Sequence, residues 1–172
     1  MKVFTIIGYT NSGKTGTLIE IIKELVKRGY NVNSVKHIHI ENFSIDTKGK
    51  DSWRHREAGA SITGVRAEGE TAIIYKKTLN VKELIPHFDG DYLALEGFSN
   101  EKLIPKVLCS KNIPDLEEKF DDTVFAISGV ITSEIKEYKG VKAINGLTHI
   151  EELVDLIEEH AIDRESLLAN YH

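Results

Sequence analysis

The sequence is poor in several features that mark particular classes of protein. It contains a single cysteine, Cys109, so an intramolecular disulfide is excluded and a reducing compartment is expected. Its apolar runs are far shorter than the ~20 residues that a membrane-spanning helix requires. No secretory signal is visible, because the first apolar run is cut short by Gly8. These absences predict a cytoplasmic protein that makes no membrane contact.

An excess of basic residues is also lacking. The chain has 22 lysines and arginines against 27 aspartates and glutamates, which gives a net charge of −5. General nucleic-acid binders carry a basic patch or stripe, so the charge balance argues against a nucleic-acid partner. The partner we expect is therefore a small molecule or another protein.

What the sequence does have is a glycine-rich loop near its start. Residues 8–15, GYTNSGKT, match the phosphate-binding pattern G-x-x-x-x-G-K-[ST] and follow the apolar run 3–7. An apolar stripe at helical spacing comes next, so the loop connects a strand to a helix, as phosphate binding requires. The pattern predicts binding of a nucleotide triphosphate.

The loop residues divide the work of binding. Lys14 is predicted to reach the β- and γ-phosphates, and the Thr15 hydroxyl is predicted to bind Mg²⁺. Backbone amides of residues 11–15 are predicted to surround the anion at the positive end of the helix. The nucleotide-binding residues expected from this loop are Gly8, Asn11, Ser12, Gly13, Lys14, Thr15 and Gly16.

Alternating strand and helix patterns along the chain predict an α/β fold with a mostly parallel central sheet. Strands are expected at 3–7, 31–40, 91–97, 104–109, 122–128 and 141–144, and a hairpin-like pair at 61–66 and 70–76. A closing helix through about His160 is expected to begin with a capping box formed by Thr148 and Glu151. Residues 1–160 read as one domain, and 161–172 as a short helix or a frayed tail.

A second acidic group near the phosphates is expected at the carboxyl end of a strand, because ligands bind at that edge of a parallel sheet. Glu96 stands there and precedes Gly97, whereas Asp91 stands at the opposite end of the same strand. We therefore predict that Glu96 is a catalytic and magnesium-binding residue.

Polar residues after the second strand offer further candidates. His37 and His39 lie two apart, so they share a strand face, which is compatible with phosphate contacts, with a metal pair or with an ordinary polar strand end. In the loop beyond, Asp46 is either a magnesium-associated carboxylate or a helix cap. Arg54 and Arg56 are too close to share a helix face, so at most one is expected to reach a phosphate; a solvated charged helix is the alternative.

The base is not identified by spacing. The Asn-Lys-x-Asp signature that reads guanine in many GTPases is absent, since residues 110–113 read SKNI. Ser128-Gly129, at the end of a late strand, is only a weak candidate for the base site.

Three stretches together resemble the molybdopterin-guanine dinucleotide biosynthesis protein B family. They are GYTNSGKT at 8–15, KHIHIENFSIDTKGKDSWRHREAGA at 36–60 and YLALEGF at 92–98. The middle stretch is the most discriminating, because many nucleotide hydrolases share the first. The resemblance runs from about residue 2 to residue 160; it departs at Gly16, where a second threonine is common.

The resemblance implies a P-loop protein of the SIMIBI group that binds GTP and Mg²⁺, hydrolyses GTP weakly and forms a homodimer. It implies a role as an adapter to the nucleotidyltransferase that converts molybdopterin to its guanine dinucleotide. It also implies that Glu96, Asp46, Asp51 and Arg54 belong to the site and that His37 lies beside the nucleotide. The catalytic residues would be Lys14, Glu96 and Arg54. The residues near the metal would be Thr15, Glu96 and Asp46.

Two other functions are compatible with the same loop. A small-molecule kinase or ligase would use the Arg54 and Arg56 patch to hold an anionic acceptor. A metallochaperone GTPase would use His37 and His39 as metal ligands. Both remain alternatives to the adapter at this point.

Overall fold

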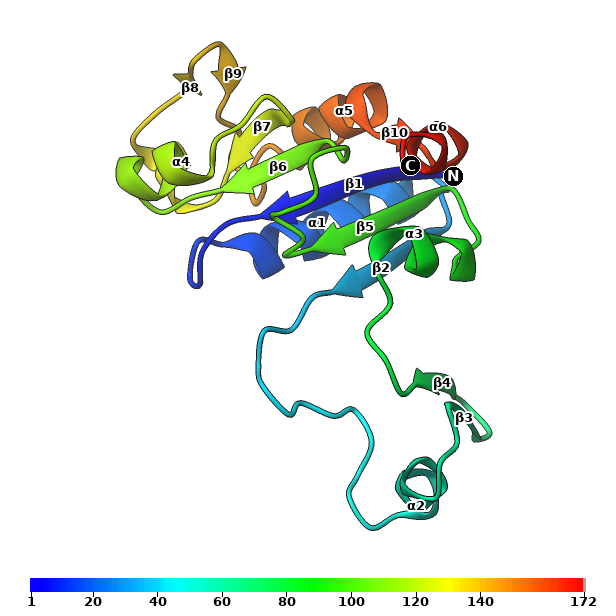
Figure 1. Cartoon of the computed structure of the whole chain (residues 1–172). Helices are drawn as coiled ribbons and strands as arrows, with labels where there is room; N and C mark the ends of the chain where they lie inside the picture. The colour runs from blue at the N-terminus through cyan, green and yellow to red at the C-terminus, as the bar shows by residue number, and fades with distance from the viewer. Residues whose placement is uncertain (172) are drawn as a thin grey trace. The chain divides into compact units, whose positions relative to one another are not determined.

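A computed structural model describes residues 1–171, which form two compact units, 1–37 with 88–171 and 38–87. Figure 1 shows the elements of both. Each unit is described by itself below, as the sheet unit (residues 1–37 and 88–171) and the hairpin unit (residues 38–87).

The sheet unit has five parallel strands in the order β2-β5-β1-β6-β7, which confirms the predicted α/β fold. Their bounds are Lys2–Ile7 for β1, Val32–Lys36 for β2, Tyr92–Glu96 for β5, Lys106–Cys109 for β6 and Val124–Ser128 for β7. β1 is central because its Val, Phe and Ile side chains are buried on both faces. The short strand β10 (Ile162–Asp163) pairs antiparallel with the start of β1.

Helices cover both faces of this sheet (Figure 1). α1 (Lys14–Lys27) and α5 (Ile150–His160) pack with Phe4 and Ile6 of β1 in the larger core cluster. α4 (Ile113–Lys119) contributes Leu116 to a second cluster that contains Ile7. Successive β1 residues thus enter opposite cores, as the strand period of two requires.

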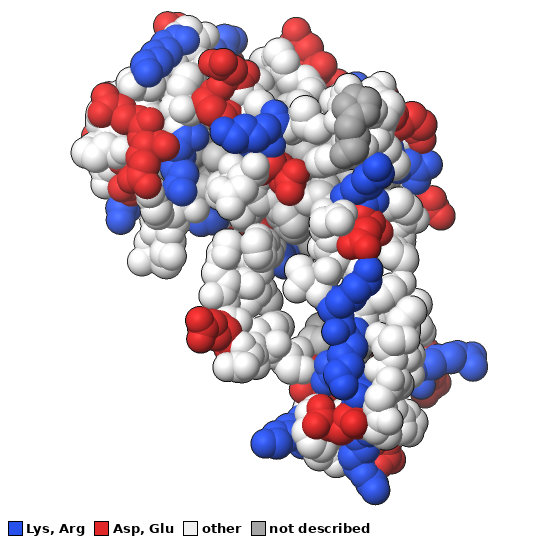
Figure 2. All heavy atoms as spheres, in the orientation of Figure 1, with Lys and Arg blue, Asp and Glu red and all other residues white. Residues whose placement is uncertain are grey.

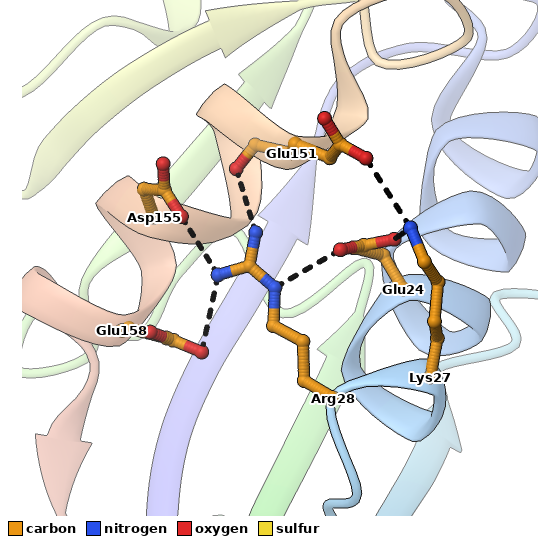
Figure 3. A network of polar contacts seen from close by, with 6 residues as sticks. All are labelled: Glu24, Lys27, Arg28, Glu151, Asp155 and Glu158. Atoms are coloured by element: carbon orange, nitrogen blue, oxygen red, sulfur yellow. Dashed lines mark hydrogen bonds and ion pairs between the residues drawn. The ribbon is translucent and has the colours of Figure 1, made fainter.

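An ion-pair network joins α1 to α5 (Figure 3). Arg28 Nε lies 3.0 Å from Glu24 Oε1, and its Nη1 lies 2.7 Å from Asp155 Oδ1 and 3.3 Å from Glu158 Oε1. Burial lowers the pKa of Arg28, but hydrogen bonds to Asp155, Glu24 and Glu158 raise it by more, so the net shift is upward. Lys27 bridges Glu24 and Glu151 alongside. The network links the C-terminal end of α1 to α5 at the surface, above the apolar contacts by which the two helices pack.

The hairpin unit contains α2 (Asp51–Glu57), then β3 (Ile62–Arg66) and β4 (Thr71–Tyr75), which pair antiparallel. This confirms the hairpin expected near residues 61–76. α3 (Val81–Leu84) and the 3-10 helix η1 (Ile85–His87) follow. The predicted second strand, 31–40, is shorter in the structure: β2 ends at Lys36, so His37 and His39 lie beyond it.

The remaining elements refine the expectations for the C-terminal part. The 3-10 helix η2 (Val130–Ser133) follows β7, and β8 (Glu137–Tyr138) pairs with β9 (Val141–Lys142). The end of the chain forms β10 and α6 (Arg164–Ala169). No helix within residues 1–171 has both the length and the apolar character to cross a membrane.

The expected capping box of the closing helix is wrong. The N-cap of α5 is His149 rather than Thr148, and no side chain caps the first turn. The Thr148 hydroxyl instead contacts Nδ1 of His149 at 2.8 Å. Backbone bonds from Thr148 and His149 to the Asn145 carbonyl form a turn that delays the helix by one residue.

Candidate functional site: the phosphate loop and its carboxylate

The loop between β1 and α1 has a backbone conformation that could hold an anion. Gly8, Asn11 and Gly13 all have positive φ, and Gly13 is the N-cap of α1. Asn11 adopts this conformation at φ 63° without being glycine, a strain typical of functional loops. A Cβ on Gly8 would lie 2.0 Å from the Cys109 carbonyl oxygen, so the loop packs against the end of β6 in a way that only glycine permits.

Two polar groups within the loop fit a phosphate ligand. The Ser12 hydroxyl is buried and has no hydrogen-bond partner among residues 1–171. The Lys14 ammonium donates to the Tyr9 carbonyl at 2.6 Å and thereby stays over the loop. Burial lowers the pKa of Lys14, with Lys36 adding to this and Cys109 and Glu96 opposing it. A phosphate at this position would place a negative charge beside the Lys14 ammonium and stabilise its charged form.

Glu96 meets Thr15 at the carboxyl edge of the sheet. The Thr15 hydroxyl donates to Glu96 Oε1 at 2.9 Å, and the Glu96 side chain is 8% exposed. Strand register explains the encounter: Glu96 is aligned with Ile6 of β1, just before the loop begins. The structure thus brings together four of the residues that the sequence predicted, namely Lys14, Thr15, Glu96 and the loop glycine Gly13.

Lys36 is a member of this site that sequence reasoning did not single out. Its ammonium lies 3.1 Å from Glu96 Oε1, the same oxygen that accepts from Thr15. The one feature of the sequence that could have indicated Lys36 is its position as the last residue of β2. In the structure β2 pairs with β5 in the register Lys36↔Glu96. Only knowledge that β2 neighbours β5 makes that signal usable.

His37 lies next to the same edge. Its backbone amide donates to the Glu96 carbonyl at 2.9 Å, and its ring lies against Phe98 with centroids 5.3 Å apart. Across residues 1–171, no group of three or more His, Cys, Asp or Glu side chains has the arrangement of a metal site. Roles for His37 in nucleotide binding and for Thr15 and Glu96 with Mg²⁺ stay predictions.

Other sequence candidates lie in the hairpin unit, where they form a network of their own. Asp46 accepts a hydrogen bond from Ser52 at 2.8 Å and pairs with Arg56 at 3.1 Å. Arg54 and Asp51 are highly exposed and lie 3.5 Å from each other. Their assignment to the nucleotide or the metal stays a prediction.

Loops from β6 and β7 complete the surroundings of the phosphate loop. The Val130 amide donates to the Ser12 carbonyl at 3.4 Å, and a Cβ on Gly129 would lie 2.1 Å from that same oxygen. The Ser128–Gly129 step, a weak candidate for the base site, therefore packs directly on the loop. Cys109, at the end of β6, is fully buried, and burial raises the pKa of its thiol to about 12.

The fold and this loop define a class: α/β proteins in which a central parallel strand leads through a glycine-rich phosphate-type loop into a helix. Comparison with known proteins narrows the class. The family model "Molybdopterin guanine dinucleotide synthesis protein B" matches residues 3–132. The chain belongs to this family.

Individual relatives agree with that membership. The chain is 33% identical to the molybdopterin-guanine dinucleotide biosynthesis adapter protein of Haemophilus influenzae, over 89% of this chain and 85% of that one. It is 32% identical to a putative adapter protein of the same description from Methanocaldococcus jannaschii, over 71% of this chain and 52% of that one. The crystal structure of Bacillus subtilis MobB matches with a TM-score of 0.77 and 26% identity, covering 95% of this chain and all of that one, 100%.

Proposed function

We propose that this protein is a GTP-binding adapter in the assembly of molybdopterin-guanine dinucleotide. It binds GTP with Mg²⁺, hydrolyses it slowly, acts as a homodimer and assists the nucleotidyltransferase that attaches the nucleotide to molybdopterin. The observation that carries the nucleotide part is the meeting of Thr15, Glu96 and Lys36 beside a loop whose Ser12 hydroxyl is buried without a partner.

Each residue of the loop has a distinct task in this proposal. Backbone amides at the start of α1 hold the β-phosphate, and Lys14 leaves the Tyr9 carbonyl to contact the β- and γ-phosphates. Thr15 and Glu96 would hold Mg²⁺, which neutralises charge on the phosphates when bound. Lys36 holds the Glu96 carboxylate in place from the side of β2.

Slow hydrolysis agrees with how Glu96 is engaged. Its Oε1 accepts from both the Thr15 hydroxyl and the Lys36 ammonium. A carboxylate oxygen that already accepts from two side chains serves to hold those side chains in place and is not left free to take a proton from a water molecule. A protein of this kind uses the bound nucleotide mainly as a ligand, which fits an adapter better than a fast enzyme.

The guanine and adapter parts of the proposal draw on the relatives. The family description and the Haemophilus influenzae relative both name molybdopterin-guanine dinucleotide. The latter is called an adapter protein and shares most of its length with this chain. Those names support guanine over adenine, and a protein partner over a small-molecule acceptor.

Calorimetry with GTP and ATP, with and without Mg²⁺, tests the nucleotide part. We expect Mg²⁺-dependent binding of GTP, weaker binding of ATP, and a loss of about 100-fold or more in GTP affinity for Lys14→Ala, because a charge-assisted contact to two phosphates is removed. Lys23→Ala is the matched control, since Lys23 lies on the same helix and is 65% exposed. Equal GTP affinity in Lys14→Ala and Lys23→Ala, or equal affinity for ATP and GTP, would overturn this part.

A further inference from the structure

The hairpin unit contains a pocket of its own, formed entirely within residues 45–74. Its volume is about 220 Å³. Val65 and Ala72, which are cross-strand partners, and Ile74 give it an apolar wall. Asp46 and Ser52 line it as well, from the loop before α2 and from α2 itself. The pocket is smaller than typical sites for whole drug-sized ligands, and it has room for a single ring system.

The polar side of the pocket is a carboxylate in a fixed position. The Asp46 side chain is 7% exposed, and it is oriented by the Ser52 hydroxyl on Oδ1 and by Arg56 on Oδ2. Its Oδ2 lies 3.1 Å from Arg56 Nη2 yet has no hydrogen bond among residues 1–171. A carboxylate has about four acceptor sites, so acceptor capacity remains for a ligand in the pocket.

The other polar residues nearby favour the same kind of ligand. Glu70 adds a second carboxylate to the lining, and the lining residues include no lysine, arginine or histidine. Thr63, which is opposite Ile74 on the same hairpin face, has a buried hydroxyl without a hydrogen-bond partner in the described chain. Arg56 lies outside the lining and neutralises Asp46 from behind, although its Nε is buried without a hydrogen-bond partner in the part of the chain that the structure describes. The two carboxylates and the apolar wall suit a flat ring that presents N–H donors at one edge better than they suit a phosphate.

We infer that this pocket binds the 2-amino-4-oxopyrimidine edge of a fused ring, with Asp46 as the acceptor. That edge presents two adjacent N–H donors, which a carboxylate accepts in a pair of parallel hydrogen bonds. Pterins and guanine both contain it, and both rings occur in the molybdopterin-guanine dinucleotide named by the family description. The choice of ring rests on the proposed function, whereas the pocket and its carboxylate do not.

The test measures binding of 6-methylpterin, guanosine and adenosine to the full-length protein by calorimetry, with energy transfer from Trp53 to the pterin as a second readout. Trp53 is the sole tryptophan and is adjacent to Ser52. We expect binding of 6-methylpterin, of guanosine, or of both, and none of adenosine, which lacks the paired donor edge. The stronger of the two ligands identifies the source of the ring.

Variants separate a binding role from a structural one. We expect Asp46→Asn to weaken ring binding about tenfold or more, because a charge-assisted acceptor is lost. Ala72→Leu adds bulk to the pocket wall at a residue that takes no part in the Ser52 and Arg56 contacts of Asp46, and it should abolish binding. Ile73→Leu, on the opposite hairpin face and 64% exposed, should not. Equal binding in the Ala72→Leu and Ile73→Leu variants, equal affinity for adenosine, or no binding of either ring would overturn the inference.

Lys14→Ala distinguishes this inference from the proposed function. It should lose triphosphate binding and keep 6-methylpterin binding, because residue 14 lies outside the pocket lining. If Lys14→Ala binds GTP normally while the pocket variants behave as expected, the nucleotide proposal fails and the pocket inference stands.

Discussion

The sheet unit and the hairpin unit differ in what holds them together. Nearly all of the buried hydrophobic residues belong to the sheet unit, and the hairpin unit contributes Val81 and Ile85. The hairpin unit instead exposes seven large hydrophobic residues to solvent: Ile38, Ile40, Phe43, Ile45, Ile62, Val65 and Ile73. A dense core thus specifies one unit, while a local polar network of Asp46, Ser52 and Arg56 shapes much of the other.

This difference indicates which kind of function each unit is suited to. A rigid core holds Thr15, Glu96 and Lys36 in a defined geometry, which the proposed phosphate site would require. Exposed apolar side chains in a thinly cored unit are typical of interaction surfaces. The surface charge of the sheet unit does not mark a binding site as clearly. Figure 2 shows acidic and basic side chains interspersed over the part of the visible face that contains the sheet.

The largest expected effect on stability comes from replacing a glycine of the sheet unit by alanine, compared with the same replacement in the hairpin unit. Gly8→Ala places a Cβ 2.0 Å from the Cys109 carbonyl at φ 140°, and we expect a loss of about 3–5 kcal/mol in the free energy of unfolding. Gly59→Ala has a positive φ of 115° but no atom within 4 Å of the added Cβ, so we expect a loss of about 1 kcal/mol. Urea unfolding followed by circular dichroism measures both. Similar losses would mean that packing against β6 does not restrain the loop.

An intermediate effect is expected from pH, through the buried thiol of the sheet unit. The pKa of Cys109 is raised to about 12 in the folded state, from 9.0. The stabilisation is therefore complete below pH 9.0 and decreases as pH rises toward 12. In that range the folding equilibrium constant should fall about tenfold per pH unit relative to Cys109→Ala. Stability curves of both proteins between these pH values measure the difference; parallel curves would contradict it.

Native thiol reactivity provides the control for that measurement. Cys109 is fully buried, so iodoacetamide should label it slowly in the folded protein and readily in urea. Rapid labelling of the folded protein, with the circular dichroism spectrum unchanged, would show that the end of β6 opens locally and that the pH effect has another source.

The smallest effect is expected at the surface between α1 and α5. Arg28→Met removes the contacts to Asp155 and Glu158 and leaves Glu24 with Lys27 alone, so the melting temperature should fall by a few degrees. Lys23→Met is the control on the same helix, because Lys23 is 65% exposed and pairs only locally with Glu20. Calorimetry at low and high salt should show the Arg28 effect shrinking with salt; equal effects at both positions would exclude a special role for the network.

Much of the candidate site could be predicted from the sequence, because its residues lie directly at the ends of strands that the apolar pattern indicates. The loop 8–15 follows a buried strand directly, and Glu96 ends another, so both were predicted and both were found at one sheet edge. Lys36 was missed because its proximity to Glu96 depends on β2 pairing with β5, which lies 60 residues away. α4 was also not predicted, although Asn112 caps it by accepting from the Asp115 amide and Pro114 occupies its first turn.

By itself, the sequence determined the α/β fold, the glycine-rich loop between β1 and α1 and the family, because local periodicity and short motifs are properties of neighbouring residues. Tertiary structure alone decided that Lys36 shares an oxygen of Glu96 with Thr15, and that Asp46 lines a pocket with the far strands of its own unit. Those encounters depend on strand order, register and the packing of distant segments, which no local pattern specifies.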